Sequence, residues 1–276
     1  MPILISMYPH RINLREPWQA IAEQNGIAYR RVFSWPTQLM PFEQLWLVLG
    51  GVDSAYQVKL NRQHLGTQPD GRLPWEMNIT SVVQNQNLIE ILCEPDPHQP
   101  FRGITRTVFL EVRRSVHLRQ LVGKVHWHGE KPGLQLWAKI SEASERRLSV
   151  VVRLNEREVH YEELPLGQLE VNVTTQPFEA PRWQRGRENV LQQLEVHLLD
   201  PACVLAQHTF ATGFARHERG EAGVALPRDE AVFESSWLEE ADRQGRIVSV
   251  VDDEVMTYWP WVWHHPCLVC SPHAPS

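Results

Sequence analysis

Alternation of apolar and polar residues dominates this chain. Along residues 55–60 every second side chain is apolar, and the same pattern recurs along 134–140, 169–173 and 194–198. A period of two is typical of a strand with one buried face. Residues 45–49 are apolar at every position, which is typical of a strand enclosed between two layers. The pattern therefore predicts a chain built of strands.

Turn-forming residues separate these runs at short intervals, for example Gly50-Gly51 and Pro69-Asp70-Gly71. Many short strands punctuated in this way predict β-sandwiches. Helical signals are sparse, and we expect only two short helices, over residues 15–24 and 228–244. The predicted fold class is all-β, with small helical additions.

Composition and charge exclude some classes of protein for this chain. The 276 residues are 42% hydrophobic and 22% charged, with a formal net charge of -6, as in ordinary globular proteins. Nucleic-acid binding requires clustered positive charge, and no basic block is present. A membrane helix requires roughly 20 consecutive apolar residues, whereas the longest apolar runs here are short. We expect neither nucleic acid nor membrane among the partners.

The four cysteines are Cys93, Cys203, Cys267 and Cys270. A disulfide framework in a small secreted domain would be denser. The N-terminus lacks the basic start and the long apolar stretch of a secretory signal. These features favour a reduced, cytoplasmic protein.

Three segments are expected along the chain. A first sandwich occupies residues 1–114, a second occupies 115–216, and a C-terminal extension, 217–276, packs on them. The charged pair Arg113-Arg114 suits the link between the two sandwiches.

A longer pattern in the first segment resembles a known module. Its parts are residues 47–61, Leu65-Gly66, the run from Asp70 to Thr80, and residues 87–91, flanked by strand-like stretches at 29–33 and 103–110. This pattern resembles the N-terminal galactose-binding-like jelly roll of glycoside hydrolase family 2, especially of bacterial β-galactosidases. The family usually has Gly after the Asn at position 61, whereas Arg62 stands here. We therefore expect a different or mildly strained turn.

The second segment resembles the immunoglobulin-like domain that follows in this family. Trp183, the strand 194–200 and the closing Gly213-Phe214-Ala215-Arg216 carry the resemblance.

In this family the chemistry belongs to a third domain, a TIM barrel with two catalytic glutamates. Retaining hydrolysis needs two carboxyl groups about 5 Å apart, and a barrel takes about 250 residues. Residues 217–276 are far too few for one. The acidic clusters Glu162-Glu163, Glu239-Glu240 and Asp252–Glu254 consist of sequence neighbours, whose side chains diverge. We expect no catalytic residues, no enzyme activity and no cofactor in this chain.

Candidate sugar-binding residues lie in the first segment. The resemblance points to Asn25 in the loop before Tyr29, and to Asp96 and His98 in the loop before Gly103. Sugar rings stack on exposed aromatic side chains, which makes Trp35 and Trp75 candidates together with the polar neighbours of Trp75. The alternatives are ordinary loop residues and packed core tryptophans. The candidate set is Asn25, Trp35, Asp70, Arg72, Trp75, Asp96 and His98.

The C-terminal segment carries two further patterns. Trp259, Trp261 and Trp263 share one face of an extended stretch, which either covers apolar surface of a sandwich or binds a protein partner. A possible zinc-ligand cluster follows, although structural zinc normally takes four ligands from two paired segments, so no metal is expected. The cluster consists of His264, His265, Cys267, Cys270 and His273.

Three functions remain open. The first is a non-catalytic carbohydrate-binding or interaction protein related to the accessory domains of family 2. The second is the N-terminal portion of a β-galactosidase-like glycosidase whose barrel is supplied by another chain or by a longer gene product. The third is a scaffold without a ligand.

Overall fold

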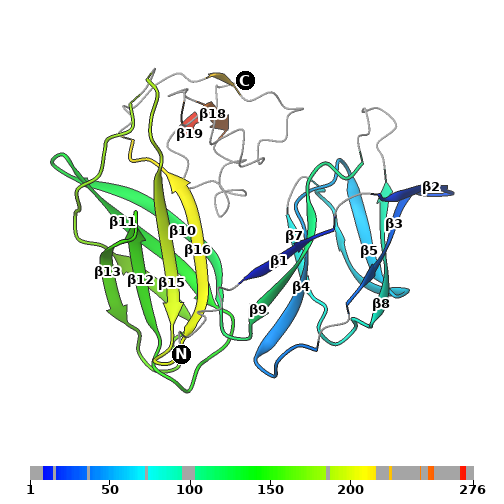
Figure 1. Cartoon of the computed structure of the whole chain (residues 1–276). Coiled ribbons are helices and arrows are strands. Elements are labelled where there is room, and N and C mark those ends of the chain that lie inside the picture. Colours follow the sequence, from blue (N-terminus) through cyan, green and yellow to red (C-terminus); the bar gives the residue numbers. More distant parts are fainter. Residues whose placement is uncertain are drawn as a thin grey trace. The chain divides into compact units, whose positions relative to one another are not determined.

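The structure is a computed structural model, shown in Figure 1. It describes residues 9–14, 17–35, 38–71, 74–94, 103–184, 187–215, 224–225, 243, 248–251 and 268–271. The chain divides into two compact units, one of which is Tyr8–Ser115, while the other begins at Val116. No described residue belongs to a helix long and apolar enough to cross a membrane.

The first unit is a sandwich of two antiparallel sheets (Figure 1). The four-stranded sheet has the order β1-β9-β4-β7, with β1 His10–Asn13, β9 Val108–Arg114, β4 Glu43–Leu49 and β7 Trp75–Asn78. The five-stranded sheet has the order β2-β3-β8-β5-β6, with β2 Gln19–Glu23, β3 Gly26–Ser34, β8 Gln86–Glu94, β5 Ala55–Leu60 and β6 Gln63–Gln68.

The core of this unit forms where the inward faces of the two sheets meet. Tyr56, Val58 and Leu60 on β5 are fully buried, as their alternation predicts. Leu45, Leu47 and Leu49 on β4 are fully buried too. The intervening Trp46 and Val48 are 8% and 9% exposed, so both faces of β4 are covered, as predicted for this all-apolar run.

The second unit is a sandwich of three strands against four, the arrangement of an immunoglobulin-like domain. One sheet has the order β10-β11-β14, with β10 Leu118–His128, β11 Lys131–Ile140 and β14 Glu170–Thr174. The other has the order β13-β12-β15-β16, with β13 Arg157–Glu163, β12 Ser149–Leu154, β15 Gln192–Leu199 and β16 Val204–Thr212. The all-β prediction is confirmed.

Three further strands lie in the C-terminal segment. They are β17 Val224–Ala225, β18 Val248–Val251 and β19 Leu268–Ser271, and they pair in parallel in chain order. Parallel neighbours need crossover connections of a dozen or more residues. Residues 226–247 and 252–267 make these connections, so this sheet has a different architecture from the antiparallel sandwiches.

One predicted helix is wrong and the other is untested. Residues 19–23 form strand β2, which pairs with β3, rather than the second half of a helix over 15–24. Asn25-Gly26 indicated a helix end, but Gln24-Asn25 forms the turn of a hairpin instead, and Gly26 is the first residue of β3. The helix expected over 228–244 lies outside the described residues, apart from Arg243.

Candidate functional site

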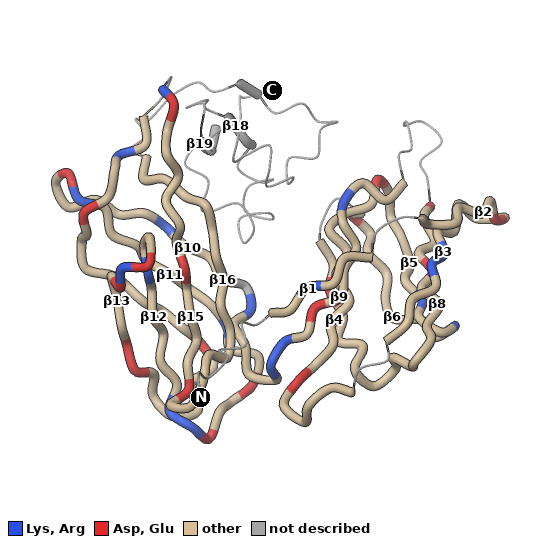
Figure 2. Tube along the Cα trace, in the orientation of Figure 1, with Lys and Arg blue, Asp and Glu red and all other residues tan. Residues whose placement is uncertain are grey.

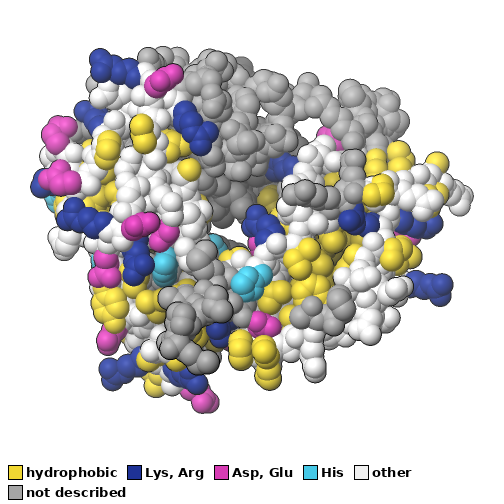
Figure 3. Space-filling model, viewed as in Figure 1, with side chains coloured by type: hydrophobic (Ala, Val, Ile, Leu, Met, Phe, Trp, Pro, Cys, Tyr) yellow, Lys and Arg dark blue, Asp and Glu magenta, His cyan; other side chains and the backbone are white. Residues whose placement is uncertain are grey.

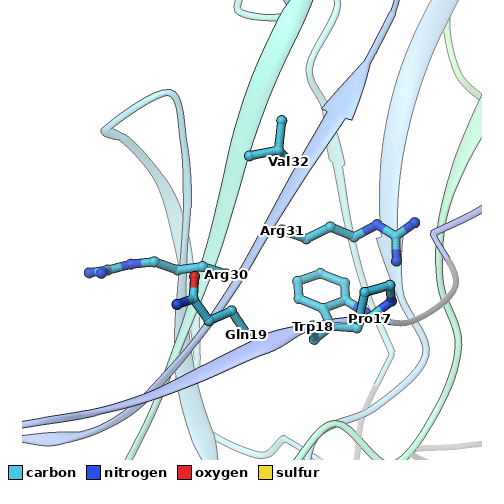
Figure 4. A pocket seen from close by; sticks show the side chains of 6 residues that line it. All are labelled: Pro17, Trp18, Gln19, Arg30, Arg31 and Val32. Carbon is cyan, nitrogen blue, oxygen red and sulfur yellow. The ribbon is translucent and has the colours of Figure 1, made fainter.

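A cavity of about 340 Å³ opens in the first domain where β2 joins β3. Its lining consists of Pro17, Trp18, Gln19, Arg30, Arg31 and Val32 (Figure 4). Ligand pockets commonly measure roughly 300–1,000 Å³, so the volume lies at the small end of that range. The lining combines one aromatic ring with hydrogen-bond donors, and none of these six side chains carries a carboxyl group.

The β2–β3 hairpin builds this cavity. Its two-residue turn, Gln24-Asn25, joins Glu23 to Gly26. Gly26 has a φ of +147°, and a Cβ atom there would overlap the carbonyl oxygen of Cys93, so only glycine fits. The antiparallel register pairs Gln19 with Arg30, which brings the preceding Trp18 beside Arg31.

The two arginines of the cavity lie on opposite faces of β3, because neighbouring residues of a strand alternate. Arg30 lies on the outer face, where its guanidinium forms ion pairs with Glu23, at 2.6 Å, and with Glu90. Lys59 lies 3.7 Å from the other oxygen of Glu90. The hydrogen bond to Glu90 raises the pKa of Arg30. Figure 2 shows positive and negative positions close together around β3, β5 and β8.

Arg31 is held differently. Its guanidinium carbon lies 6.0 Å from the centroid of the Trp18 ring, close enough for a cation–π contact. In Figure 4 the side chain extends over Trp18 toward Pro17, whereas Arg30 and Gln19 point to the other side. Trp18 is half-buried and packs against the core of the domain. One wall of the cavity is therefore both aromatic and cationic.

A second cavity, of about 230 Å³, lies at the other end of β3. It is lined by Trp35, Leu39, Thr80, Val83, Gln84 and Asn85. The backbone NH of Trp35 donates to the carbonyl of Asn85 at 2.9 Å, and the side chain is only 8% exposed. Trp35 thus belongs to the core, which was the structural alternative to sugar stacking, and it offers little ring surface to a ligand.

The other sequence candidates lie apart from the first cavity. Asn25 is exposed in the β2–β3 turn, Asp70 is half-buried in a bend, and Trp75 is half-buried on β7. The indole of Trp75 lies against Gly66, where an added Cβ would approach it to 3.1 Å. Arg72, Asp96 and His98 lie outside the described residues. None of the described candidates lines the first cavity, which we call the Trp18 cavity.

Sequence reasoning missed Trp18 and Arg31 as site residues. A signal for Arg31 was present, because Ile27, Tyr29 and Phe33 share its face of β3 and are all apolar. A charged residue at an otherwise apolar alternating position indicates either a paired buried charge or a binding group. Nothing comparable marked Trp18, which lay in the segment expected to be helical.

The C-terminal candidates remain predictions. Trp259, Trp261 and Trp263 lie outside the described residues, as do His264, His265, Cys267 and His273. Of Cys270 only the backbone, in β19, is described. Elsewhere in the described part of the chain, no three His, Cys, Asp or Glu side chains are grouped as metal ligands.

The surface charge can be described for one face of the immunoglobulin-like domain. On the visible side of the immunoglobulin-like domain, basic and acidic side chains are interspersed (Figure 3). A nucleic-acid interface would need them segregated. Of the two cavities described, the one beside Trp18 is the larger, and it is the one whose lining includes charged side chains.

Comparison with known proteins agrees with this architecture. Residues 10–103 match the family described as glycosyl hydrolase 2 galactose-binding domain-like. No curated protein sequence matches the chain.

Solved structures of β-glucuronidases share its fold. An FMN-binding β-glucuronidase from Facaelibacterium prausnitzii L2-6 has a TM-score of 0.77 at 13% identity, covering 96% of this chain and 58% of its own. For a β-glucuronidase of an uncultured Clostridium sp. the TM-score is 0.67 at 14% identity, with 88% and 56% covered. One from Ruminococcus gnavus gives 0.74 at 13% identity, with 95% and 67% covered.

The chain thus spans less than two thirds of the first two of these structures, and identities this low establish the fold alone. The family match and the shared architecture agree for the first unit: residues 10–103 have the fold of, and match the family model for, the galactose-binding-like domain of glycosyl hydrolase family 2.

Proposed function

We propose that this chain binds carbohydrate without hydrolysing it, and that the Trp18 cavity is the sugar site. The observation that carries the proposal is the aromatic wall of a cavity in a galactose-binding-like domain. The flat C–H face of a pyranose packs against an indole ring, and small-molecule sites are commonly lined by such rings. Hydrolysis needs a pair of carboxyl groups, which the lining of this cavity does not supply.

A thermal-shift experiment with monosaccharides and short oligosaccharides tests this proposal. A ligand at ten times its Kd stabilises the folded state by about 1.4 kcal/mol, which raises the Tm of a domain of this size by roughly 5 °C. We expect Trp18→Ala to abolish the shift. Trp75→Ala is the matched control, because it removes another half-buried tryptophan of the same domain and leaves the cavity intact.

Two outcomes would contradict the proposal. The absence of any shift with wild-type protein would remove carbohydrate binding altogether. A shift that survives Trp18→Ala but is lost in Trp75→Ala would move the site to the loop between Asp70 and Trp75.

The parallel sheet β17-β18-β19 favours a second candidate function. Three parallel strands in chain order, joined by long connections, are typical of a fold that alternates strands and helices. This arrangement supports the alternative in which the chain is the N-terminal portion of a glycosidase, completed by another polypeptide or by a longer gene product. The β-glucuronidase structures, which extend well beyond the region shared with this chain, are consistent with that alternative.

An aryl-glycoside turnover assay separates the two candidates. Under the binding proposal the purified chain turns over neither aryl β-galactosides nor aryl β-glucuronides. If a neighbouring reading frame encodes a family barrel without sandwiches, co-expression with this chain is the informative assay. Turnover that requires both polypeptides would establish the second candidate, and turnover by this chain alone would refute the binding-only function.

A further inference from the structure

Arg31 occupies a position that the fold otherwise reserves for core residues. Its antiparallel partner on β8 is Ile89, which is fully buried. The flanking residues on the same face of β3, Tyr29 and Phe33, are both part of the core or packed against it. On the inner faces of β3, β8 and β5, Arg31 is the one charged side chain that the structure describes.

The guanidinium of Arg31 is incompletely paired. Its Nε and Nη1 atoms are buried, and neither has a hydrogen-bond partner among the residues that the structure describes. Within the described part of the domain, the guanidinium contacts the Trp18 ring, whose face attracts the cation but accepts no conventional hydrogen bond. Buried donors without acceptors are costly, and more so when they carry charge.

The neighbouring Arg30 provides an internal comparison. It differs by one position along β3, it faces outward, and it is paired with both Glu23 and Glu90. Those carboxylates lie on the outer face with Arg30. Among the described residues, no carboxylate forms an ion pair with Arg31. Strand β3 thus carries Arg30, which forms ion pairs with two carboxylates, and Arg31, which forms none with the described residues.

We propose that Arg31 selects an acidic saccharide by binding its carboxylate, while Trp18 packs against the sugar ring. This inference rests on the proposed function, because it names the class of sugar that the Trp18 cavity takes. A guanidinium presents a planar fork of donors that matches the two oxygens of a carboxylate. A uronic acid carries such a group on the ring that the indole contacts.

The experiment compares matched pairs of ligands by isothermal titration calorimetry with the full chain. The pairs are methyl β-D-glucuronide with methyl β-D-glucoside, and methyl α-D-galacturonide with methyl α-D-galactoside. A hydrogen bond to a charged group contributes about 1.5–3 kcal/mol, so the acidic member should bind roughly tenfold to a hundredfold more tightly. Added salt should reduce this preference, because it screens charge.

Variants then assign the preference to one residue. Arg31→Met should equalise the affinities of the acidic and neutral members, and it should fold, because it removes an incompletely paired buried charge. Arg31→Lys keeps the charge without the fork and should retain only part of the preference. Lys59→Gln is the matched control, because Lys59 is a cation of the same sheet that lies outside the cavity lining, and it should preserve the preference. Arg30→Gln tests the other arginine of the lining.

The possible failures are distinguishable. Equal binding of acidic and neutral members by the wild-type chain would overturn the role of Arg31 and leave sugar binding intact. Binding of neither member would overturn both proposals. Loss of the preference in Arg30→Gln but not in Arg31→Met would place the carboxylate on the outer face. Acetate binding as tightly as the uronides would show that an anion, rather than an acidic sugar, is recognised.

Discussion

Glu111 on β9 is a buried carboxylate in the first domain, only 4% exposed. One of its oxygens lies 2.7 Å from Nη2 of Arg11, and the other lies 2.6 Å from Nη2 of Arg113. Arg113 is also 2.8 Å from Glu76 and lies over the Trp46 ring. Burial would raise the pKa of Glu111, but the ion pairs with Arg113 and Arg11 outweigh it and lower the pKa below its ordinary value.

This lowered pKa predicts acid sensitivity. An unfolded Glu titrates near pH 4.3, whereas folded Glu111 titrates lower, so protons bind the unfolded chain first. The contribution of Glu111 to stability is therefore complete above about pH 5 and is lost as the pH falls through the unfolded value toward the folded one. Urea titrations at pH 7, 5, 4 and 3 should show the free energy of unfolding decreasing over that interval, and Glu111→Gln should decrease less.

Glu94→Gln is the control for this prediction, because Glu94 is an exposed residue of the same domain. It should follow the wild-type pH profile. If Glu111→Gln loses as much stability on acidification as wild type, other carboxylates are responsible.

At the scale of elements, two hairpins, one in each domain, are closed by the same type of turn. Asn61-Arg62 connects β5 to β6, and Asn155-Glu156 connects β12 to β13. All four residues have positive φ, between 47° and 69°, as a type I′ turn requires. Each Asn also accepts from a backbone NH of a neighbouring strand: Leu88 to Asn61 at 3.0 Å and Gln193 to Asn155 at 2.8 Å. Of the two alternatives expected for Arg62, a different turn type or a mildly strained turn, its positive φ supports the strained turn.

Replacing the second residue of each turn by glycine should stabilise the protein. A left-handed conformation destabilises the folded state by about 1–2 kcal/mol for a residue with a Cβ atom, and glycine avoids this cost. Glycine also has more conformational entropy in the unfolded chain, which offsets roughly 0.5–1 kcal/mol of that gain. Arg62→Gly and Glu156→Gly should therefore each increase the free energy of unfolding of their own domain by about 0.5–1 kcal/mol in denaturant titrations.

Arg62→Ala distinguishes the cause, since it removes the charge and keeps the Cβ atom. It should give no such gain. Equal stabilisation by Ala and Gly would indicate that the arginine charge, rather than backbone strain, is unfavourable.

Period-two patterns predicted the strands and their buried faces well, because alternation reports directly which side of a strand is covered. The residues of the Trp18 cavity were harder to foresee. Asn25-Gly26 is compatible with a helix end and with a hairpin, and only pairing with β3, a tertiary contact, decides between them. Once β2 is a strand, Trp18 lies beside Arg31. The site therefore depends on the pairing of β2 with β3, which the propensities of the individual residues do not determine.

For the molecule as a whole, the two domains have separate cores. The buried cluster around Leu45, Leu47 and Ile91 shares no residue with the one around Leu136, Val150 and Phe214. Cooperative unfolding follows the core, so each domain is expected to unfold as its own unit.

Scanning calorimetry tests this independence with one core substitution per domain. Leu47→Ala and Leu136→Ala each remove a fully buried leucine and should cost about 3–5 kcal/mol. Each should lower the temperature of a different transition. A single transition lowered by both variants would instead show that the domains unfold together.

The order of strands in the first domain also determines when it can fold. Strand β9 lies between β1 and β4, although it is the last strand of the domain along the chain, and Arg11 contacts Glu111 a hundred residues later. Synthesis proceeds at about 5–20 residues per second, so β1 waits roughly 5–20 s for its partner. From its own synthesis until β9 emerges, β4 also lacks a neighbour on one side, and that edge is open to pairing with other chains. The nascent protein therefore has a period of vulnerability to aggregation that ends only when the last strand of the domain emerges.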